Sequence, residues 1–250
     1  MSKSDLRMII FDFDGVIADS EKAHFEMFGQ SLLDEGIELT WPEYCEKYLG
    51  YSDLECIKQV LADKGRQYDN ETVERFFQRK KALFAHFIEQ NSLIIPGVRR
   101  LLEELCSESI ICSICSGALT EEIEFILNKE RLRDFFAFIV SADDVSQSKP
   151  DPEGYRLCLD RINVVDEDCS LANNADYPAK SDADTGRMRV LAGQCVVIED
   201  SIWGIQAAHA ADMRCLAVGT SYPAEKLREA EMVVNNLTEV NAALLRKVIL

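Results

Sequence analysis

The sequence predicts an α/β protein, a doubly wound parallel sheet with a small helical bundle inserted near its start. Three observations carry this prediction. The uncharged run Met8–Phe11 is typical of a strand that is covered on both faces. Four amphipathic segments then follow one another over residues 21–91 with no strand pattern between them. From Leu93 onwards, short apolar runs alternate with amphipathic stretches, which is the pattern of repeated β-α units.

The alternating part of the chain supplies the expected sheet and forms a discontinuous core domain, 1–19 and 95–250. Strands are expected at residues 8–11, 110–115, 138–141, 195–198 and 214–218, with a short edge strand at 233–234. Five helices are expected in this part. The first begins at Pro96-Gly97, the second spans 119–128 and the third ends near 163, and the last two span 203–211 and 238–248.

The helical part is expected to form a separate bundle over residues 20–94. Helices are expected over 21–36 and 70–89, and two more should begin at the capping-box patterns Thr40-Trp-Pro-Glu43 and Ser52-Asp-Leu-Glu55. In the last of these helices we expect Arg79 and Lys80 on the solvated face, because charged side chains are rarely buried.

Length, charge and apolar content limit the possible classes of function. A chain of 250 residues with 47% hydrophobic and 28% charged residues has the composition of a globular protein. The formal net charge of −17 disfavours nucleic acid and anionic membranes as partners. There is no apolar stretch of about 18 residues and no signal-peptide pattern. We therefore expect a cytoplasmic protein with no nucleic-acid or membrane partner.

The nine cysteines are typical of small apolar residues in a reducing compartment, because several lie inside apolar runs. Cys112-Ser-Ile-Cys115 has the C-x-x-C spacing of redox and metal sites. In a strand, residues i and i+3 point to opposite faces, so the two sulfur atoms could not meet. We expect buried structural cysteines at these positions.

The polar stretch 166–193 interrupts the alternation where a connection of a few residues would be normal. We expect a surface excursion there, with a short helix near 185–192. Asp182 and Asp184 could suggest calcium, but the other ligands of a calcium loop are missing, so a solvated loop is favoured.

Polar residues follow the apolar strands at the points where these strands end. They are Asp12 and Asp14 after the first strand, Ser116-Gly117 after the second and Glu199-Asp200 after the fourth, and Lys149 follows the third strand after a loop. Because the carboxyl ends of parallel strands share one edge, we expect these four segments to meet in one crevice. Taken alone, the two aspartates could equally be an acidic turn.

Phosphoryl transfer is the chemistry that these residue types fit, since it needs a nucleophile, charge screening and an acid for the leaving group. Asp12 can attack phosphorus and form an aspartyl-phosphate. Asp14 can protonate the leaving oxygen and later deprotonate water. Asp12, the carbonyl of Asp14, Glu199 and Asp200 offer the oxygen ligands that Mg²⁺ prefers.

The positive charge of Lys149 and the polar groups of Ser116 and Gly117 suit the binding of phosphate oxygens. Lys149 is a compact positive charge that can also screen the nucleophile. Ser116 and Gly117 precede a helix, and amide groups at the start of a helix bind anions. The sequence thus predicts a small phosphorylated metabolite as the partner.

These residues resemble the motifs of the haloacid dehalogenase superfamily over nearly the whole chain. Asp12-Phe-Asp14-Gly-Val resembles its first motif, Ser116 its second, Lys149 its third and residues 196–205 its fourth. The helical segment is placed like the family's helical cap. The resemblance implies a Rossmann-like core, dependence on Mg²⁺ and an aspartyl-phosphate intermediate, in a protein of a size that works as a monomer.

Further motifs are similar to the β-phosphoglucomutase and phosphatase branch of this superfamily. They are Asp19-Ser-Glu21, His24, Leu49-Gly50-Tyr-Ser52, Pro96-Gly97-Val98 and Lys149-Pro-Asp-Pro152. The resemblance suggests substrate contacts for His24, Gly50 and Tyr51. His24 could bond Asp14 or the substrate, and its alternative is a partly exposed helix residue. Tyr51 could line a substrate pocket, although an aromatic residue in a small bundle is more often part of its core.

A phosphatase that hydrolyses a small phosphate monoester, such as a sugar phosphate, is the favoured function. The mutases of this branch carry basic residues at the positions of Leu49 and Asp53, and an acidic residue there would repel a second phosphate. A sugar-phosphate mutase is the alternative. A catalytically silent binding protein is a remote one, since every motif residue is present.

Overall fold

A computed structural model describes residues 5–33, 35–48, 51–165 and 189–250 of the chain. The chain divides into two compact units, which are joined at two points and are considered separately below. The first unit is Met1–Ala18 with Ile94–Leu250, and the second is Asp19–Leu93.

The first unit is built on a six-stranded sheet of order β3-β2-β1-β4-β5-β6, in which all neighbours are parallel. Its strands are β1 (Met8–Phe11), β2 (Ile111–Cys115), β3 (Ile139–Val140), β4 (Cys195–Glu199), β5 (Arg214–Val218) and β6 (Met232–Val234). Its helices are α5 (Val98–Ser107), α6 (Thr120–Lys129), α7 (Glu153–Val165), α8 (Ile202–Ala210) and α9 (Ala242–Val248). The predicted doubly wound α/β fold is confirmed.

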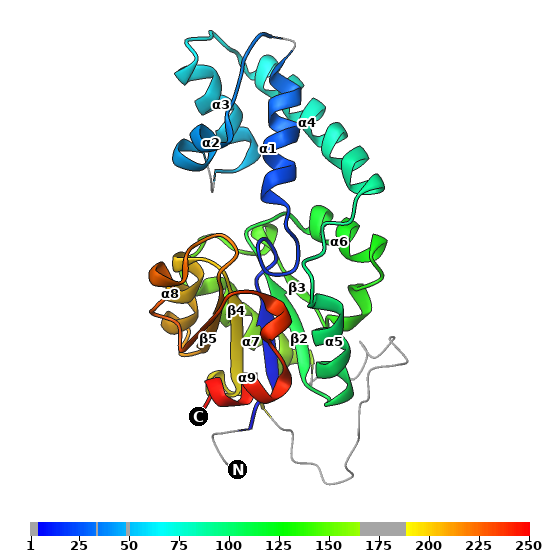
Figure 1. The fold of residues 1–250 in the computed structure, drawn as a ribbon, viewed down its shortest axis with the longest axis vertical. Helices are drawn as coiled ribbons and strands as arrows, with labels where there is room; N and C mark the ends of the chain where they lie inside the picture. The colour runs from blue at the N-terminus through cyan, green and yellow to red at the C-terminus, as the bar shows by residue number, and fades with distance from the viewer. Residues whose placement is uncertain (1–4, 34, 49–50, 166–188) are drawn as a thin grey trace. The chain divides into compact units, whose positions relative to one another are not determined.

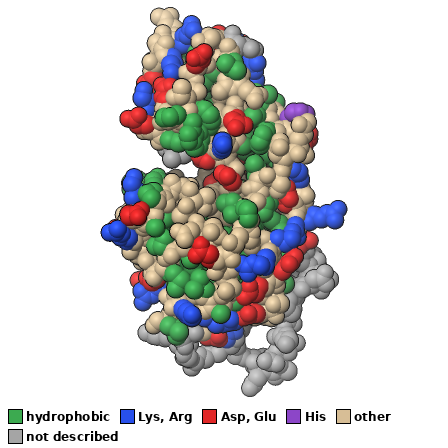
Figure 2. Space-filling model, viewed as in Figure 1, with side chains coloured by type: hydrophobic (Ala, Val, Ile, Leu, Met, Phe, Trp, Pro, Cys, Tyr) green, Lys and Arg blue, Asp and Glu red, His purple; other side chains and the backbone are tan. Residues whose placement is uncertain are grey.

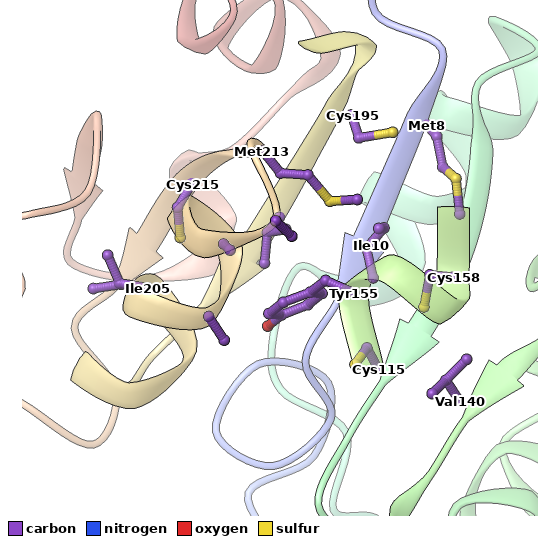
Figure 3. Close-up of a cluster of buried hydrophobic side chains, with 14 of the residues drawn as sticks. Met8, Ile10, Cys115, Val140, Tyr155, Cys158, Cys195, Ile205, Met213 and Cys215 are labelled. Carbon is purple, nitrogen blue, oxygen red and sulfur yellow. The ribbon is translucent and has the colours of Figure 1, made fainter. Parts of the chain in front are cut away.

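Both faces of the sheet are covered, which explains why β1 carries no polar residue. All four side chains of β1 are fully buried. Met8 and Ile10 pack with residues of α7 and α8 in one cluster, within which Tyr155 and Cys158 are labelled in Figure 3. Figure 1 shows α5 and α9 in front of the sheet and α7 behind it. A strand buried in this way requires apolar residues at every position.

The second unit contains α1 (Glu21–Leu33), α2 (Trp41–Lys47), α3 (Asp53–Asp63) and α4 (Asn70–Gln90), as the four amphipathic segments predict. Thr40 caps α2, and Ser52 and Glu55 form the predicted capping box of α3. An apolar cluster from all four helices, including Phe28, Tyr48 and Phe76, forms the core of this unit.

Some expected boundaries were wrong, each for a local reason. The first helix ends at Leu33, and Gly36 then takes a left-handed conformation (φ 66°). The expected helix over 238–248 begins only at Ala242, because the Asn241 side chain accepts a hydrogen bond from the Leu244 amide and caps the helix there. Most of the stretch 166–193, with Asp182 and Asp184, lies outside the described residues.

The surface in Figure 2 carries basic and acidic side chains in small mixed groups. None of the helices in the described ranges is long and apolar enough to cross a membrane.

Candidate active site

Asp12 and Asp14 lie in a tight turn directly after β1. The Asp12 amide donates to the Ile198 carbonyl of β4 at 2.9 Å, so the ladder continues to this residue. Asp12 is 8% exposed and Asp14 is half-buried. Gly15 then takes a left-handed conformation (φ 75°), and its amide donates to the Ala18 carbonyl at 2.8 Å. The turn therefore ends the strand with the carboxylate of Asp12 inside the protein.

Gly15 also makes room for an acid from another strand. A Cβ atom at this position would lie 1.8 Å from Oδ2 of Asp200. Any other residue would thus have to displace Asp200, in addition to the strain of its backbone conformation. Glycine at position 15 allows the segment after β1 and the segment after β4 to approach each other.

Lys149 connects three of the predicted segments through its ammonium group. Its Nζ donates to Oδ1 of Asp12 at 2.7 Å, to Oε1 of Glu199 at 2.7 Å and to the Cys115 carbonyl at 3.0 Å. Burial alone would lower the pKa of Lys149, but the charges of Asp12 and Glu199 raise it well above its ordinary value. Lys149 is therefore a fixed positive charge beside the predicted nucleophile.

Glu199 is completely buried and accepts five hydrogen bonds. Oε1 accepts from Lys149 and from the Tyr155 hydroxyl at 2.8 Å. Oε2 accepts from the amides of Asp200 and Ser201 and from the Ser201 hydroxyl. A Cβ atom at Gly204 would lie 1.7 Å from Oε1, so glycine in the first turn of α8 makes the space for this carboxylate.

Asp200 accepts a hydrogen bond from the Ser221 hydroxyl, which comes from the segment after β5. Asp200 is 4% exposed. Burial, followed by the charge of Glu199, raises its pKa to about 7. Burial likewise raises the pKa of Asp12 well above its ordinary value, and Lys149 only partly opposes this.

The three buried acids fit a divalent cation. Asp12, Glu199 and Asp200 each offer a ligand atom, and these atoms lie within 4.8 Å of one another. With one lysine against three carboxylates, the cluster carries two excess negative charges when all groups are ionised. Closely placed carboxylates require a cation or a proton. A hard ion with oxygen ligands, such as Mg²⁺, suits this set.

Ser116 and Gly117 follow β2 at the same edge of the sheet. The register that pairs Phe11 with Ile114 places Asp12 beside Cys115, the residue before Ser116. Ser116 is 5% exposed, and its Oγ accepts a hydrogen bond from the Ala118 amide at 2.9 Å. Gly117 is exposed, and α6 begins three residues later. The predicted phosphate-binding segment therefore begins at the end of β2, next to the end of β1 that carries Asp12.

The predicted substrate residues of the helical unit have different surroundings. His24 lies on α1, where its Nδ1 atom is 2.5 Å from Nζ of Lys80 and its ring stacks on Phe84 at 4.1 Å between centroids. Tyr51 is 50% exposed. Gly50 and Leu49 lie outside the described residues. The substrate contacts of His24, Gly50 and Tyr51 stay predictions.

The expectation that Lys80 is solvated was wrong, because this residue is 1% exposed. Its Nζ donates to Oδ2 of Asp53 at 2.7 Å and lies 4.9 Å and 4.8 Å from the ring centroids of Phe28 and Phe84. The sequence contained a signal for this burial. Lys80 stands four residues after Phe76 and four before Phe84, on the apolar stripe of α4.

Tyr155 and Ser221 were also missed, although both donate hydrogen bonds to predicted metal ligands. Tyr155 reads as an ordinary core aromatic of an amphipathic helix, and Ser221 as one polar residue of a loop. Only the packing of α7 and of the segment after β5 against β4 brings them to the acids.

Comparison with known proteins agrees with this arrangement. The sequence profile of the haloacid dehalogenase-like hydrolases matches residues 9–171. A phosphorylated carbohydrates phosphatase of Thermotoga maritima is 28% identical over 82% of this chain and 82% of its own. The β-phosphoglucomutase of Bacillus subtilis is 25% identical over 97% and 95%. The crystal structure of CbbY from Rhodobacter sphaeroides with phosphate shares the fold (TM-score 0.76, 21% identity, coverage 96% and 99%).

Proposed function

Because the chain belongs to the haloacid dehalogenase-like hydrolases, we propose that it is a Mg²⁺-dependent phosphatase of small phosphate monoesters, such as sugar phosphates. One observation carries this proposal: the buried Asp12 lies at the end of β1 with the Lys149 ammonium group 2.7 Å from Oδ1. A carboxylate that lies beside a lysine, whose charge opposes the effect of burial on its pKa, is suited to attack phosphorus. The relative from Thermotoga maritima is named as a phosphatase of phosphorylated carbohydrates.

The proposed reaction has two steps, both at Asp12. In the first, a carboxylate oxygen of Asp12 bonds to phosphorus while the bond from phosphorus to the ester oxygen breaks, and Asp14 gives its proton to that oxygen. In the second, Asp14 takes a proton from water as this water attacks the aspartyl-phosphate. Inorganic phosphate leaves and Asp12 is regenerated. Lys149 offsets negative charge on the phosphoryl oxygens throughout.

Asp12, Asp200 and Glu199, with the carbonyl of Asp14, would hold Mg²⁺. Bound there, the ion reduces the repulsion between the nucleophile and the phosphate and polarises the phosphoryl oxygens. Ser116 and the amides from Gly117 onwards would bind phosphate oxygens. We propose His24, Gly50 and Tyr51 as contacts to the remainder of the substrate.

A sugar-phosphate mutase is the second candidate, and the Lys80–Asp53 pair bears on it. An acidic residue at position 53 would repel a second phosphate if its charge were free. Asp53 is paired with Lys80 at 2.7 Å, so most of this repulsion is compensated. Conversion of β-glucose 1-phosphate that depends on the bisphosphate would favour the mutase. Release of inorganic phosphate alone would favour the phosphatase.

The test of the proposed function is turnover of p-nitrophenyl phosphate and of a panel of sugar phosphates with and without Mg²⁺. The Asp12→Asn variant removes the nucleophile with little change in volume and serves as the control. We expect turnover that requires Mg²⁺ and is abolished in this variant. If the wild type hydrolysed none of these esters with Mg²⁺, the enzyme proposal would fail and a binding protein would be the better description.

A further inference from the structure

We propose that Tyr155 is a positioning residue of this site: its hydroxyl orients Glu199, which in turn holds Lys149 on Asp12. The proposal rests on the proposed function for the identity of the ligand, a phosphoryl group bound beside Asp12. Tyr155 itself does not touch the reacting atoms in this scheme.

Tyr155 contacts both members of the ion pair that it is proposed to organise. Its hydroxyl donates to Oε1 of Glu199 at 2.8 Å, and the same oxygen accepts from Lys149 at 2.7 Å. The Lys149 ammonium group also lies 5.1 Å from the centroid of the Tyr155 ring, within the range of a cation–π contact. A single side chain of α7 is thus in contact with the last residue of β4 and with a residue of the loop after β3.

Packing alone does not require a tyrosine here. Tyr155 is completely buried in the apolar cluster of the core, and Figure 3 shows its ring near Ile10, Cys115 and Cys158. A phenylalanine would fill nearly the same space without the cost of burying a hydroxyl group. The hydroxyl is compensated by its bond to the Glu199 carboxylate, a bond to a charged acceptor and therefore stronger than a neutral one.

The five donors around Glu199 are divided between its two carboxylate oxygens. Because Tyr155 and Lys149 donate to the same oxygen, Tyr155 can influence the position of Lys149. Oε2 is fixed by three donors at the start of α8, namely the amides of Asp200 and Ser201 and the Ser201 hydroxyl. Oε1 has two donors, Lys149 and Tyr155. Of the two donors that the described residues give Oε1, Lys149 is the one that stays when the Tyr155 hydroxyl is removed. We expect the ammonium group to move toward Glu199 and away from Asp12.

The experiment compares Tyr155→Phe with wild type and with Tyr48→Phe in the full-length protein. Tyr48 is a matched control, because it is 1% exposed, its hydroxyl donates to a carboxylate, Asp63, at 2.9 Å, and it belongs to the helical unit. The probe is orthovanadate, an analogue of the phosphoryl transition state, titrated by calorimetry at saturating Mg²⁺. Turnover of p-nitrophenyl phosphate and the melting temperature are measured in parallel.

We expect Tyr155→Phe to weaken vanadate binding and to lower kcat, each about tenfold, the usual effect of losing a partner of a site residue. Tyr48→Phe should leave both unchanged. While a variant stays almost fully folded at the assay temperature, a loss of stability hardly changes its dissociation constant for vanadate, so a merely structural role would lower the melting temperature alone. Unchanged vanadate binding and kcat in Tyr155→Phe, or equal changes in Tyr48→Phe, would overturn the proposal.

A second variant tests whether the orientation of Glu199 affects ligand binding, by a change at Oε2 in place of Oε1. It also covers the case in which Tyr155→Phe does not fold. Ser201→Ala removes one donor from Oε2 of Glu199 and should also weaken vanadate binding, whereas unchanged binding would contradict the proposal. If wild type binds vanadate but hydrolyses no ester, the proposed function fails and the role of Tyr155 stands. If wild type binds no vanadate, both fail.

Discussion

Among the described residues, each of the two units has a lysine that is largely buried and paired with a carboxylate, but these two lysines have opposite surroundings. Lys149 of the sheet unit faces two carboxylates and a carbonyl, and its side chain is 19% exposed. Lys80 of the helical unit faces one carboxylate, one histidine nitrogen and two aromatic rings, and its side chain is 2% exposed.

The difference lies in the balance of charge. Around Lys80 the single carboxylate of Asp53 balances the single ammonium group, so the cluster is neutral if His24 is neutral. A lysine that donates to Nδ1 requires this nitrogen to accept, which leaves the His24 proton on Nε2. Around Lys149 the acids exceed the lysine. The helical unit thus has a charge-balanced pair, Lys80 with Asp53, that stabilises its fold. The sheet unit has an unbalanced site, whose excess negative charge favours the binding of a cation.

Removal of Lys149 should have the largest effect on activity. We expect Lys149→Met to lower kcat/KM about a thousandfold, because the phosphoryl oxygens lose a positive charge in a buried site. Lys149→Arg should recover only part of the activity, since a planar guanidinium group cannot replace a compact ammonium group with three acceptors. Steady-state kinetics on one phosphate ester measure both. A loss of less than about tenfold in Lys149→Met would place Lys149 with Lys80 as a structural lysine.

The second largest effect should be a dependence of stability on Mg²⁺ and pH, which we expect from the acids around Lys149 and not from the cluster around Lys80. Because the pKa of Asp200 is raised to about 7, the folded state holds its proton more tightly than the unfolded state does. Without metal, this group should therefore make the protein less stable as the pH rises from about 4 to 7. Mg²⁺ binds the ionised form, so its affinity should increase about tenfold per pH unit up to pH 7 and level off above it.

Thermal unfolding with and without Mg²⁺ at pH 5.5 and pH 8 measures this effect. The stabilisation by Mg²⁺ should be much larger at pH 8, and Asp200→Asn should remove most of the difference. Equal stabilisation at both pH values would mean that no buried acid titrates in this range. The Lys80 cluster, which needs no metal, should contribute nothing to the response.

The comparison also shows which parts of the site the sequence could predict. Asp12 and Asp200 directly follow the apolar strands β1 and β4, and the parallel sheet brings strand ends to one edge whatever the details of packing. Lys149 comes later, at the end of the loop after β3, and a loop that starts at this edge can return to it. Tyr155 and Ser221 reach the same acids from the body of a helix and from a loop, so only tertiary packing places them. The charge of Lys80 predicts a solvated side chain, whereas its position on the helical stripe between Phe76 and Phe84 predicts burial, and the structure agrees with the stripe.

Lys80→Met should lower stability without removing the site of the sheet unit. The methionine would occupy the space between Phe28 and Phe84, but Asp53 would lose its cation while 29% exposed. Partial access to water reduces the penalty, so we expect a loss of about 1–3 kcal/mol in the free energy of unfolding. Urea denaturation measures this loss, and vanadate binding at saturating Mg²⁺ should stay at the wild-type value.

The double variant Lys80→Met with Asp53→Asn tests whether the two charges stabilise each other as a balanced pair. Removal of both charges should recover part of the lost stability, because the second change removes an unpaired carboxylate. If the two losses simply add, Asp53 and Lys80 do not form a coupled pair, and the contrast with Lys149 is wrong.

Ser221→Ala should give the smallest effect, and it tests how finely the unbalanced site is arranged. The Ser221 hydroxyl donates to Oδ2 of Asp200, and this bond fixes the carboxylate over Gly15. Without it Asp200 can rotate, so we expect the Mg²⁺ concentration for half-maximal activity to rise about threefold, with kcat nearly unchanged. Ser146→Ala is a matched control, since that hydroxyl also donates to a carboxylate, Glu153, at 2.9 Å on the surface. If both variants respond to Mg²⁺ as wild type does, the position of Asp200 is fixed by the backbone and by Gly15 alone.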